Sequence, residues 1–242
     1  MKGVILAAGR GSRLAELNLQ HKSFAIVQKK HIINFSLDLL TNEDASKSLV
    51  DEIIIVVGHN KEVIIETIGN SYCGVPIKYV EQKELKGIAH AILTAKDCIN
   101  DDFIMCLADE ILIHPNLEGM LSYFRATDSI CTCGVIIDGE DQTGKPIAYK
   151  VDSDFIVEVE EKPSNGYPND IRGIGEVIFK KECLDFLTRL QPNPKRGELE
   201  MGDWIQMAVS EKGTVTFYPL AEAYVNINYA KDIEIANQLL EK

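Results

Sequence analysis

Short apolar runs alternate along the chain with longer segments whose apolar residues recur at helical spacing. Residues 3–8, 53–57 and 103–108 are apolar throughout and are followed by Gly or Asp, which is typical of buried strands. Further apolar or alternating runs predict strands at residues 130–137, 155–160, 177–179, 215–218 and 224–227. Helical patterns cover residues 31–40, 61–68, 88–99, 116–124, 183–190, 198–209 and 232–240.

The order of these elements predicts an α/β fold. Strand and helix alternate through the first half of the chain, which favours a mixed, mostly parallel sheet with helices on both faces. Two successive strand patterns on either side of residues 151–154 predict a small antiparallel insertion within residues 130–162. No linker or internal repeat interrupts the pattern, so we expect a single domain over residues 1–242.

Composition narrows the class of partner. The net charge is −12, and a chain this acidic repels nucleic acids and anionic membrane surfaces, so we expect neither as a partner. The apolar run after Met1 is too short for a signal peptide, and no segment approaches the roughly 20 apolar residues of a membrane span. We therefore expect a cytoplasmic protein; assembly into a homo-oligomer is left open.

A glycine-rich loop follows the first predicted strand and is the strongest local signal. Gly9 and Gly11 let the backbone approach anionic oxygens, and Arg13 adds a forked donor suited to phosphate. A dinucleotide-binding loop requires glycine where Leu14 stands, and the Gly-Lys-Ser/Thr ending of a P-loop is absent. A plain strand-to-helix turn is the remaining alternative, although it does not require two glycines with two arginines.

This loop resembles the opening motif of the sugar-phosphate nucleotidyltransferases, L-A-G/A-G-x-G-x-R-L, which is followed by Pro-Lys. Lys22 stands at the lysine position, with His21 in place of the proline and one residue fewer between the two motifs. The resemblance implies a Rossmann-like fold in which Arg13 and Lys22 are catalytic. It also implies that the triphosphate is bound by Ala7, Ala8, Gly9, Gly11 and Ser12.

Further motifs of the same family follow in order along the chain. Residues 82–91 resemble its base-binding Q-x4-G-x-A-x-A segment, residues 107–110 its metal-binding L-G-D-x, and residues 160–163 its E-E-K-P. The resemblance implies base contacts at Gln82 and Gly87, metal ligands at Asp109 and Asn226, sugar contacts at Ala148, Glu161 and Gly175, and a catalytic Lys162 on the sugar phosphate. Two positions depart from the family pattern: Asn226 replaces an aspartate, and Ala148 replaces a glycine.

Most of these residues also fit purely structural roles. Asp109 could be a helix N-cap for the region of Pro115 or lie in a solvated turn, and Asn226 could be a turn residue at a strand end. The charged residues 160–162 alone would indicate a solvated hairpin, and Gln82 alone an exposed loop residue. The ordered set of motifs, and not any single one, favours the functional interpretation.

The implied reaction joins two polyanions. An oxygen of a sugar 1-phosphate attacks the α-phosphorus of a nucleoside triphosphate, and pyrophosphate leaves. A phosphate monoester has a second pKa of about 6, so the attacking group is largely a dianion at neutral pH and no general base is required. What remains is charge neutralisation and alignment, for which we expect lysine and arginine together with Mg²⁺ held by the hard oxygen of Asp109.

The substrates are predicted less sharply than the reaction. UTP or dTTP is favoured, but a glutamine amide can flip to serve uracil, thymine or cytosine, so Gln82 does not fix the base. A cytidylyltransferase acting on a non-sugar phosphate or phosphonate is one alternative. A nucleotide-sugar-binding regulatory subunit is another, kept open by Asn226. A nicotinamide-dependent oxidoreductase is disfavoured by Leu14.

Overall fold

The computed structural model describes residues 1–11, 13, 14, 21–42, 45–137, 147–161, 169–211 and 213–241. Its strands are β1 (Lys2–Ala7), β2 (Ile26–Val27), β3 (Lys30–His31), β4 (Glu52–Val57), β5 (Ser71–Tyr72), β6 (Val75–Glu81), β7 (Phe103–Leu107), β8 (Glu110–Ile113), β9 (Cys131–Ile137), β10 (Ile147–Asp152), β11 (Phe155–Glu161), β12 (Ile171–Phe179), β13 (Val215–Pro219) and β14 (Ala223–Asn226). Its α-helices are α1 (Ile32–Leu40), α2 (Lys61–Ile68), α3 (Ile88–Ala95), α4 (Leu117–Ala126), α5 (Leu184–Leu187), α6 (Met201–Ser210) and α7 (Ala230–Leu240).

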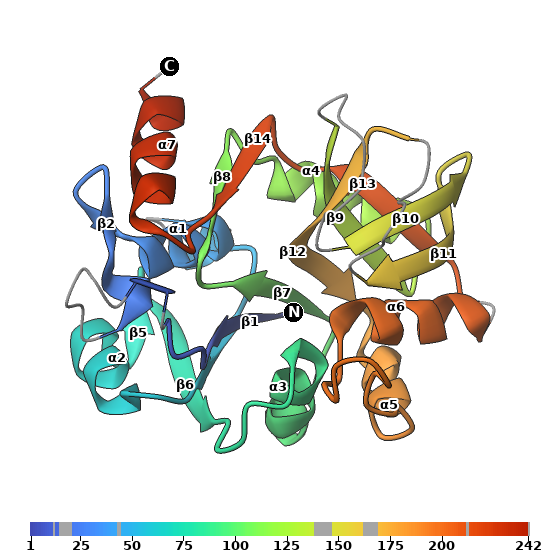
Figure 1. Ribbon diagram of the computed structural model, residues 1–242, viewed down its shortest axis with the longest axis horizontal. Helices are drawn as coiled ribbons and strands as arrows, with labels where there is room; N and C mark the ends of the chain where they lie inside the picture. The colour runs from blue at the N-terminus through green and yellow to red at the C-terminus, as the bar shows by residue number, and fades with distance from the viewer. Residues whose placement is uncertain are drawn as a thin grey trace.

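One large mixed sheet organises the described residues. Its ten strands lie in the order β10-β11-β13-β9-β12-β7-β1-β4-β6-β5. Strands β7, β1, β4 and β6 are mutually parallel, and β12 pairs antiparallel with both β7 and β9. Figure 1 shows β10, β11 and β13 at the opposite end of the molecule from β5 and β6. The predicted α/β fold class with a mixed sheet is confirmed.

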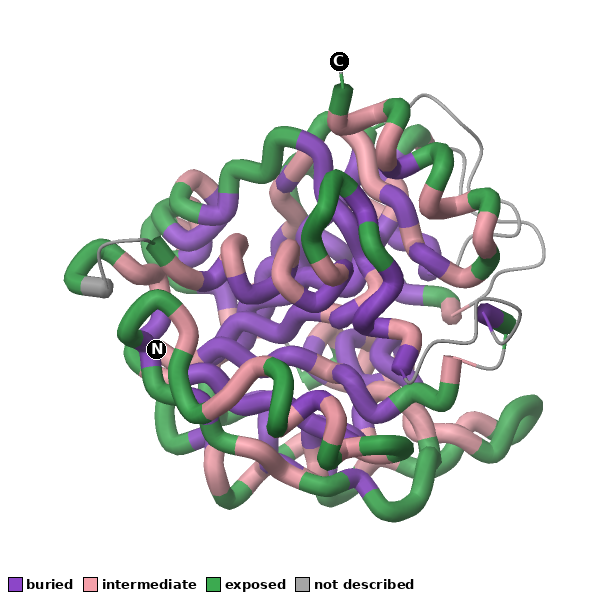
Figure 2. The backbone as a smooth tube through the Cα atoms, turned by 90° about the vertical axis from the view of Figure 1, so that its left-hand side faces the viewer, coloured by how far each residue is buried: buried purple, intermediate pink, exposed green. Residues whose placement is uncertain are grey.

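Helices cover both faces of this sheet because its central strands are apolar on both sides. Successive side chains of a strand point to opposite faces. Val4 accordingly joins a core cluster with residues of α3, α5 and α6, whereas the neighbouring Ile5 joins a second cluster with α1, α2 and α4. Figure 2 shows the buried backbone of these strands running through the centre of the molecule. The sequence pattern of uninterrupted apolar runs predicted this double coverage.

An aromatic stack secures the second half of the sheet. Trp204 of α6 is fully buried, and its ring lies 4.0 Å from that of Phe179 at the end of β12. Its indole Nε1 donates a hydrogen bond to the carbonyl of Cys183 at 2.9 Å. Stacked aromatic pairs contribute about 1 kcal/mol beyond the area that they bury. Trp204 therefore attaches α6, whose amino-terminal end borders the cavity described below, to the core.

The predicted antiparallel insertion is a hairpin continuous with the main sheet. β10 and β11 pair antiparallel, and Phe155 of β11 pairs with Thr216 of β13. Residues 131–137, which the sequence placed in the same insertion, instead form the interior strand β9, between β13 and β12. This part of the prediction was wrong because adjacency in sequence does not determine adjacency in a sheet.

A second, two-stranded sheet lies beside the main one and positions part of the site. β14 pairs antiparallel with β8, and their register places Asn226 opposite Glu110. The short β8 was not predicted, and neither was β6, whose exposed positions alternate with buried ones. None of the helices in the described ranges is long and apolar enough to cross a membrane.

Candidate active site

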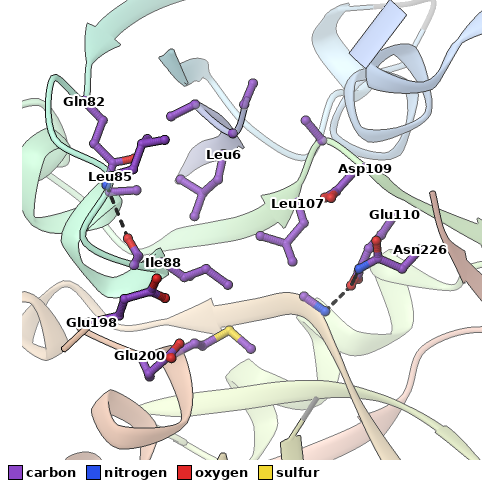
Figure 3. Close-up of a pocket in the computed structure, with 18 of the residues that line it drawn as sticks. Leu6, Gln82, Leu85, Ile88, Leu107, Asp109, Glu110, Glu198, Glu200 and Asn226 are labelled. Carbon is purple, nitrogen blue, oxygen red and sulfur yellow. Dashed lines mark hydrogen bonds between the residues drawn. The ribbon is translucent and has the colours of Figure 1, made fainter. Parts of the chain in front are cut away.

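A cavity of about 400 Å³ opens at the carboxyl ends of β1 and β7, where open α/β sheets bind ligands. Figure 3 shows Gln82 and Ile88 on one side of it and Asp109, Glu110 and Asn226 on the other, with Glu198 and Glu200 along a third wall. Ten of the residues predicted from the sequence line this cavity: Ala7, Ala8, Gly9, Lys22, Gln82, Gly87, Asp109, Glu161, Gly175 and Asn226. Residues far apart in the sequence thus line the same cavity.

Three predicted residues lie elsewhere. Ala148 is fully buried away from the cavity, and its neighbour Ile147 lines the wall, because adjacent strand residues face opposite ways. Gly11 is not part of the cavity wall, and neither is the exposed Arg13, whose Nη1 donates to Asn228 Oδ1 at 3.2 Å. Ser12 and Lys162 lie outside the described residues.

The glycine-rich loop permits a close approach of Lys22. Gly11 has a φ of +62°, and a Cβ placed there would lie 2.5 Å from Cβ of Lys22. His21, which directly precedes Lys22, caps the 3-10 turn at residues 22–24. Its Nδ1 accepts a hydrogen bond from the backbone N–H of Ser23 at 3.2 Å. Burial lowers the pKa of His21 to about 4, helped by the charge of Lys22. His21 is therefore neutral near pH 7, and Lys22 carries the positive charge at this wall.

Lys22 and Asp109 form an ion pair across the cavity. Lys22 Nζ contacts Asp109 Oδ2, and only 16% and 18% of the two side chains are exposed. Asp109 follows β7 directly, and its carbonyl accepts a hydrogen bond from the backbone N–H of Ile227 at 2.8 Å. Because the two side chains are partly buried, solvent and salt screen the attraction between them only weakly. A bound phosphate and a bound cation would compete for these two charges.

A pair of buried carboxyl groups supports this wall from behind. Glu110 Oε2 accepts from the backbone N–H of Gly175 at 2.8 Å, and Oε1 accepts from Asn226 Nδ2 at 3.1 Å. Burial, reinforced by the charge of Asp109, raises the pKa of Glu110 to about 7. Burial and the adjacent Glu110 raise the pKa of Glu176 well above its ordinary value. The two carboxyls therefore retain at least one proton near neutral pH.

The opposite wall is built around Gln82 and the start of α3. Gln82 Nε2 lies 3.3 Å from the carbonyl oxygen of Gly87 and 2.9 Å from His90 Nδ1. Gly87 has a φ of +104°, and a Cβ there would lie 2.3 Å from the carbonyl oxygen of Leu199. Glycine is therefore required for the segment before α6 to lie against the start of α3. Leu199 exchanges backbone hydrogen bonds with Lys86 and Ala89 at 2.8 and 3.0 Å.

Comparison with known proteins identifies the family. The family described as "Nucleotidyl transferase" matches residues 2–229, nearly the whole chain. This chain is a member of that family. It is 31% identical over 244 residues to the UTP–glucose-1-phosphate uridylyltransferase AglF of Haloferax volcanii, covering 100% of this chain and 97% of that one. The sequence-based assignment to the sugar-phosphate nucleotidyltransferases is confirmed.

A second relative and a solved structure resemble this chain as well. A glucose-1-phosphate thymidylyltransferase of Streptomyces griseus is 27% identical over 212 residues, which is 86% of this chain and 57% of that protein. A solved structure of a UDP-glucose pyrophosphorylase complexed with UDP-glucose superposes with a TM-score of 0.82. It covers 98% of this chain and 97% of its own at 22% identity, which supports the shared fold.

Residues 196–200 contribute side chains to the cavity wall that were not predicted from the sequence. Arg196 lines the wall next to Glu198 and Glu200, and its Nη1 lies 2.7 Å from Glu200 Oε1. The sequence contained a signal: Arg196, Glu198 and Glu200 place charged residues at alternate positions next to an apolar helical pattern. Glu161 was predicted, and its Oε2 accepts from the backbone N–H of Gly202 in the first turn of α6 at 3.0 Å. The start of α6 thus borders Glu161, a predicted sugar contact.

Two side-chain oxygens in the cavity are suitable ligands for a hard divalent cation whose other ligands would be water and substrate phosphates. Asp109 offers a carboxylate, and Asn226, which lines the same cavity, offers its side-chain Oδ1. This Oδ1 also accepts a hydrogen bond from Asn228 Nδ2 at 2.7 Å. Mg²⁺ is commonly held by one or two protein oxygens with water and substrate phosphates. Within the described part of the chain, no group of three or more His, Cys, Asp or Glu residues could hold a metal ion. Two protein oxygens would leave the other positions around an octahedral Mg²⁺ to water and substrate phosphates.

Proposed function

We propose that this protein transfers a nucleotidyl group from a nucleoside triphosphate to a sugar 1-phosphate and releases pyrophosphate. The observation that carries the proposal is the convergence of Lys22 and Asp109 with the predicted base and sugar residues around one cavity. Membership of the nucleotidyl transferase family supports the reaction type. Relatives named as a uridylyltransferase and a thymidylyltransferase, both acting with glucose 1-phosphate, support UTP or dTTP and a hexose 1-phosphate as substrates.

The chemistry requires one bond to form and one to break. A phosphate oxygen of the sugar 1-phosphate bonds to the α-phosphorus of the nucleotide, and the bond between the α-phosphorus and the bridging oxygen breaks, so that this oxygen leaves with pyrophosphate. The attacking dianion needs no base, and His21, whose pKa burial lowers to about 4, would be a weak one. The protein supplies alignment and compensating charge, which account for most of the catalysis in phosphoryl-type transfer.

Each wall of the cavity has a role in this proposal. Lys22 lies between the two reacting phosphates, Arg13 steadies the departing pyrophosphate, and Lys162 holds the sugar phosphate. Arg196, a cation already in the wall, is a further candidate for the sugar phosphate. Residues 7–9 line the cavity and would contact the triphosphate, and Gln82 with Gly87 would face the base. Gly11 and Ser12 are triphosphate contacts implied by the sequence motif alone. Glu161 and Gly175 face the sugar, with Ile147 in the place expected for Ala148.

Asp109 and Asn226 would hold Mg²⁺. When bound, a divalent cation neutralises phosphate charge and orients the triphosphate. The protein's own contribution is to present two oxygens from adjacent segments: the turn after β7 and the end of β14. The buried Glu110 fixes the amide of Asn226 through the 3.1 Å hydrogen bond, so that its Nδ2 faces away from the cation site.

A direct assay tests the proposal. The protein is incubated with Mg²⁺, each nucleoside triphosphate and a panel of sugar 1-phosphates, and pyrophosphate release is coupled to phosphate detection. We expect turnover, and a loss of about 10²–10³-fold in kcat for Lys22→Met, because one preorganised charge is removed. Lys150→Met, at an exposed position of the β10–β11 hairpin, is the matched control and should retain activity. Binding of a nucleotide sugar without turnover on any pair would refute the enzyme and favour a regulatory subunit.

A further inference from the structure

The amide of Gln82 is held from two sides in a single orientation. Gln82 is only 4% exposed and lines the cavity at the end of β6. One neighbour of its Nε2 is the carbonyl oxygen of Gly87 at 3.3 Å, and the other is His90 Nδ1 at 2.9 Å (the first contact is drawn in Figure 3). A carbonyl oxygen can only accept a hydrogen bond, so the atom that faces Gly87 must be the NH₂ nitrogen of the amide.

The second contact then fixes the state of His90. Because Gln82 Nε2 donates, His90 Nδ1 must accept, which requires a neutral imidazole with its proton on Nε2. Burial and the charge of Lys86 lower the pKa of His90, and only Glu84 opposes them, so the neutral form prevails. Both hydrogens of the Gln82 amide are engaged by these two acceptors, so Oε1 is the amide atom that remains for a ligand in the cavity that Gln82 lines, and it can only accept.

We infer that His90 is a positioning residue which keeps Gln82 as a hydrogen-bond acceptor, so that the cavity selects a nucleobase with a ring N–H at the contacted position. Uracil and thymine carry that N–H at N3, between two carbonyl groups. Cytosine carries an unprotonated N3, whose lone pair would oppose Oε1. The inference rests on the proposed function and narrows its substrate to uridine or thymidine triphosphate. It also removes the ambiguity of a freely flipping amide.

Two variants of His90 separate positioning from packing. His90→Leu keeps a side chain of similar bulk but removes the shorter of the two contacts, so that only the 3.3 Å contact with the carbonyl of Gly87 opposes a flip of the Gln82 amide. His90→Gln retains an acceptor oxygen and serves as the conservative control. Calorimetric binding of UTP, CTP and 3-methyl-UTP, without a sugar phosphate, reports base selection independently of turnover.

The expected result is a change in preference and not in binding as a whole. The wild type should bind UTP at least about 10-fold more tightly than CTP and 3-methyl-UTP, because the last two leave Oε1 without a donor. His90→Leu should reduce the UTP-to-CTP ratio about 10-fold, and His90→Gln should stay within about 3-fold of the wild type. An unchanged ratio in His90→Leu, or equal losses in both variants, would overturn the inference.

The wild type offers a second measurement that needs no variant. As the pH falls through the lowered pKa of His90, below its ordinary 6.5, Nδ1 becomes a donor and opposes Gln82 Nε2. The charged groups near the ring are Lys86 and Glu84, and Glu84 retains its charge over this range because Lys86 lowers its pKa. The ratio of UTP to 3-methyl-UTP affinity should fall as His90 takes up its proton, which NMR of the same samples follows, and a ratio that stays constant through that titration would refute the orientation. Absence of any nucleotide binding by the wild type would instead refute the proposed function, and this inference with it.

Discussion

Replacing Glu176 by Gln should make the protein less sensitive to alkaline destabilisation. Glu176 is 1% exposed, and its pKa is raised above the ordinary 4.5 first by burial and then by the neighbouring Glu110. The folded pair therefore retains a proton that the unfolded chain releases above about pH 4.5. The amide of a glutamine has nearly the shape of a protonated carboxyl and can donate to Glu110 without holding a titratable proton.

The magnitude follows from proton linkage. Where the folded state binds one more proton than the unfolded state, the free energy of unfolding falls by about 1.4 kcal/mol for each pH unit. This loss begins above the unfolded pKa and continues until the pH reaches the raised pKa of the folded group. Glu176→Gln removes the term, so the variant should gain about 1.4 kcal/mol relative to the wild type for each pH unit between the unfolded pKa and the raised pKa of the folded group.

Urea unfolding at pH 5, 6, 7 and 8, without divalent cations, measures this difference. Glu66→Gln, at an exposed position of α2, is the matched control and should show the same pH dependence as the wild type. A stability difference between Glu176→Gln and the wild type that stays constant from pH 5 to pH 8 would refute the shared proton. Equal slopes for Glu176→Gln and Glu66→Gln would lead to the same conclusion.

Three further predictions concern other parts of the molecule. Gly87→Ala forces a Cβ to within 2.3 Å of the carbonyl oxygen of Leu199 at a positive φ, and should cost about 1–3 kcal/mol in urea unfolding; wild-type stability would contradict the close approach. Trp204→Phe leaves a void and strips Cys183 of its 2.9 Å donor, so the unfolding free energy should fall by about 1–3 kcal/mol. Asn226→Ala should raise the Mg²⁺ concentration for half-maximal activity by about 10-fold; an unchanged magnesium dependence would remove Asn226 from the metal site.

The sequence by itself determined the class of fold and most of the chemistry. A strand made of an uninterrupted apolar run, such as residues 53–57, is apolar on both faces. Both faces must be buried, which requires a layer of helices on each side of the sheet. Glycine followed by arginine after the first strand, and aspartate after the third predicted strand, placed phosphate and cation chemistry at strand ends. The fold class and the positions of these residues at strand ends followed from the sequence because side-chain period and strand-end position are local properties of a chain.

Only the tertiary structure decided how these groups act on one another. The register of β14 against β8 sets Asn226 against Glu110, and the irregular part of β12 between Gly173 and Val177 carries Glu176, which lies next to Glu110. Likewise the approach of residues 196–200 to the start of α3 adds Arg196 to the cavity, and the turn of α3 brings His90 to Gln82. Such contacts depend on register and on burial, which together set proton positions and hydrogen-bond direction. Neither can be read from spacing along the chain, because both are properties of the packed molecule.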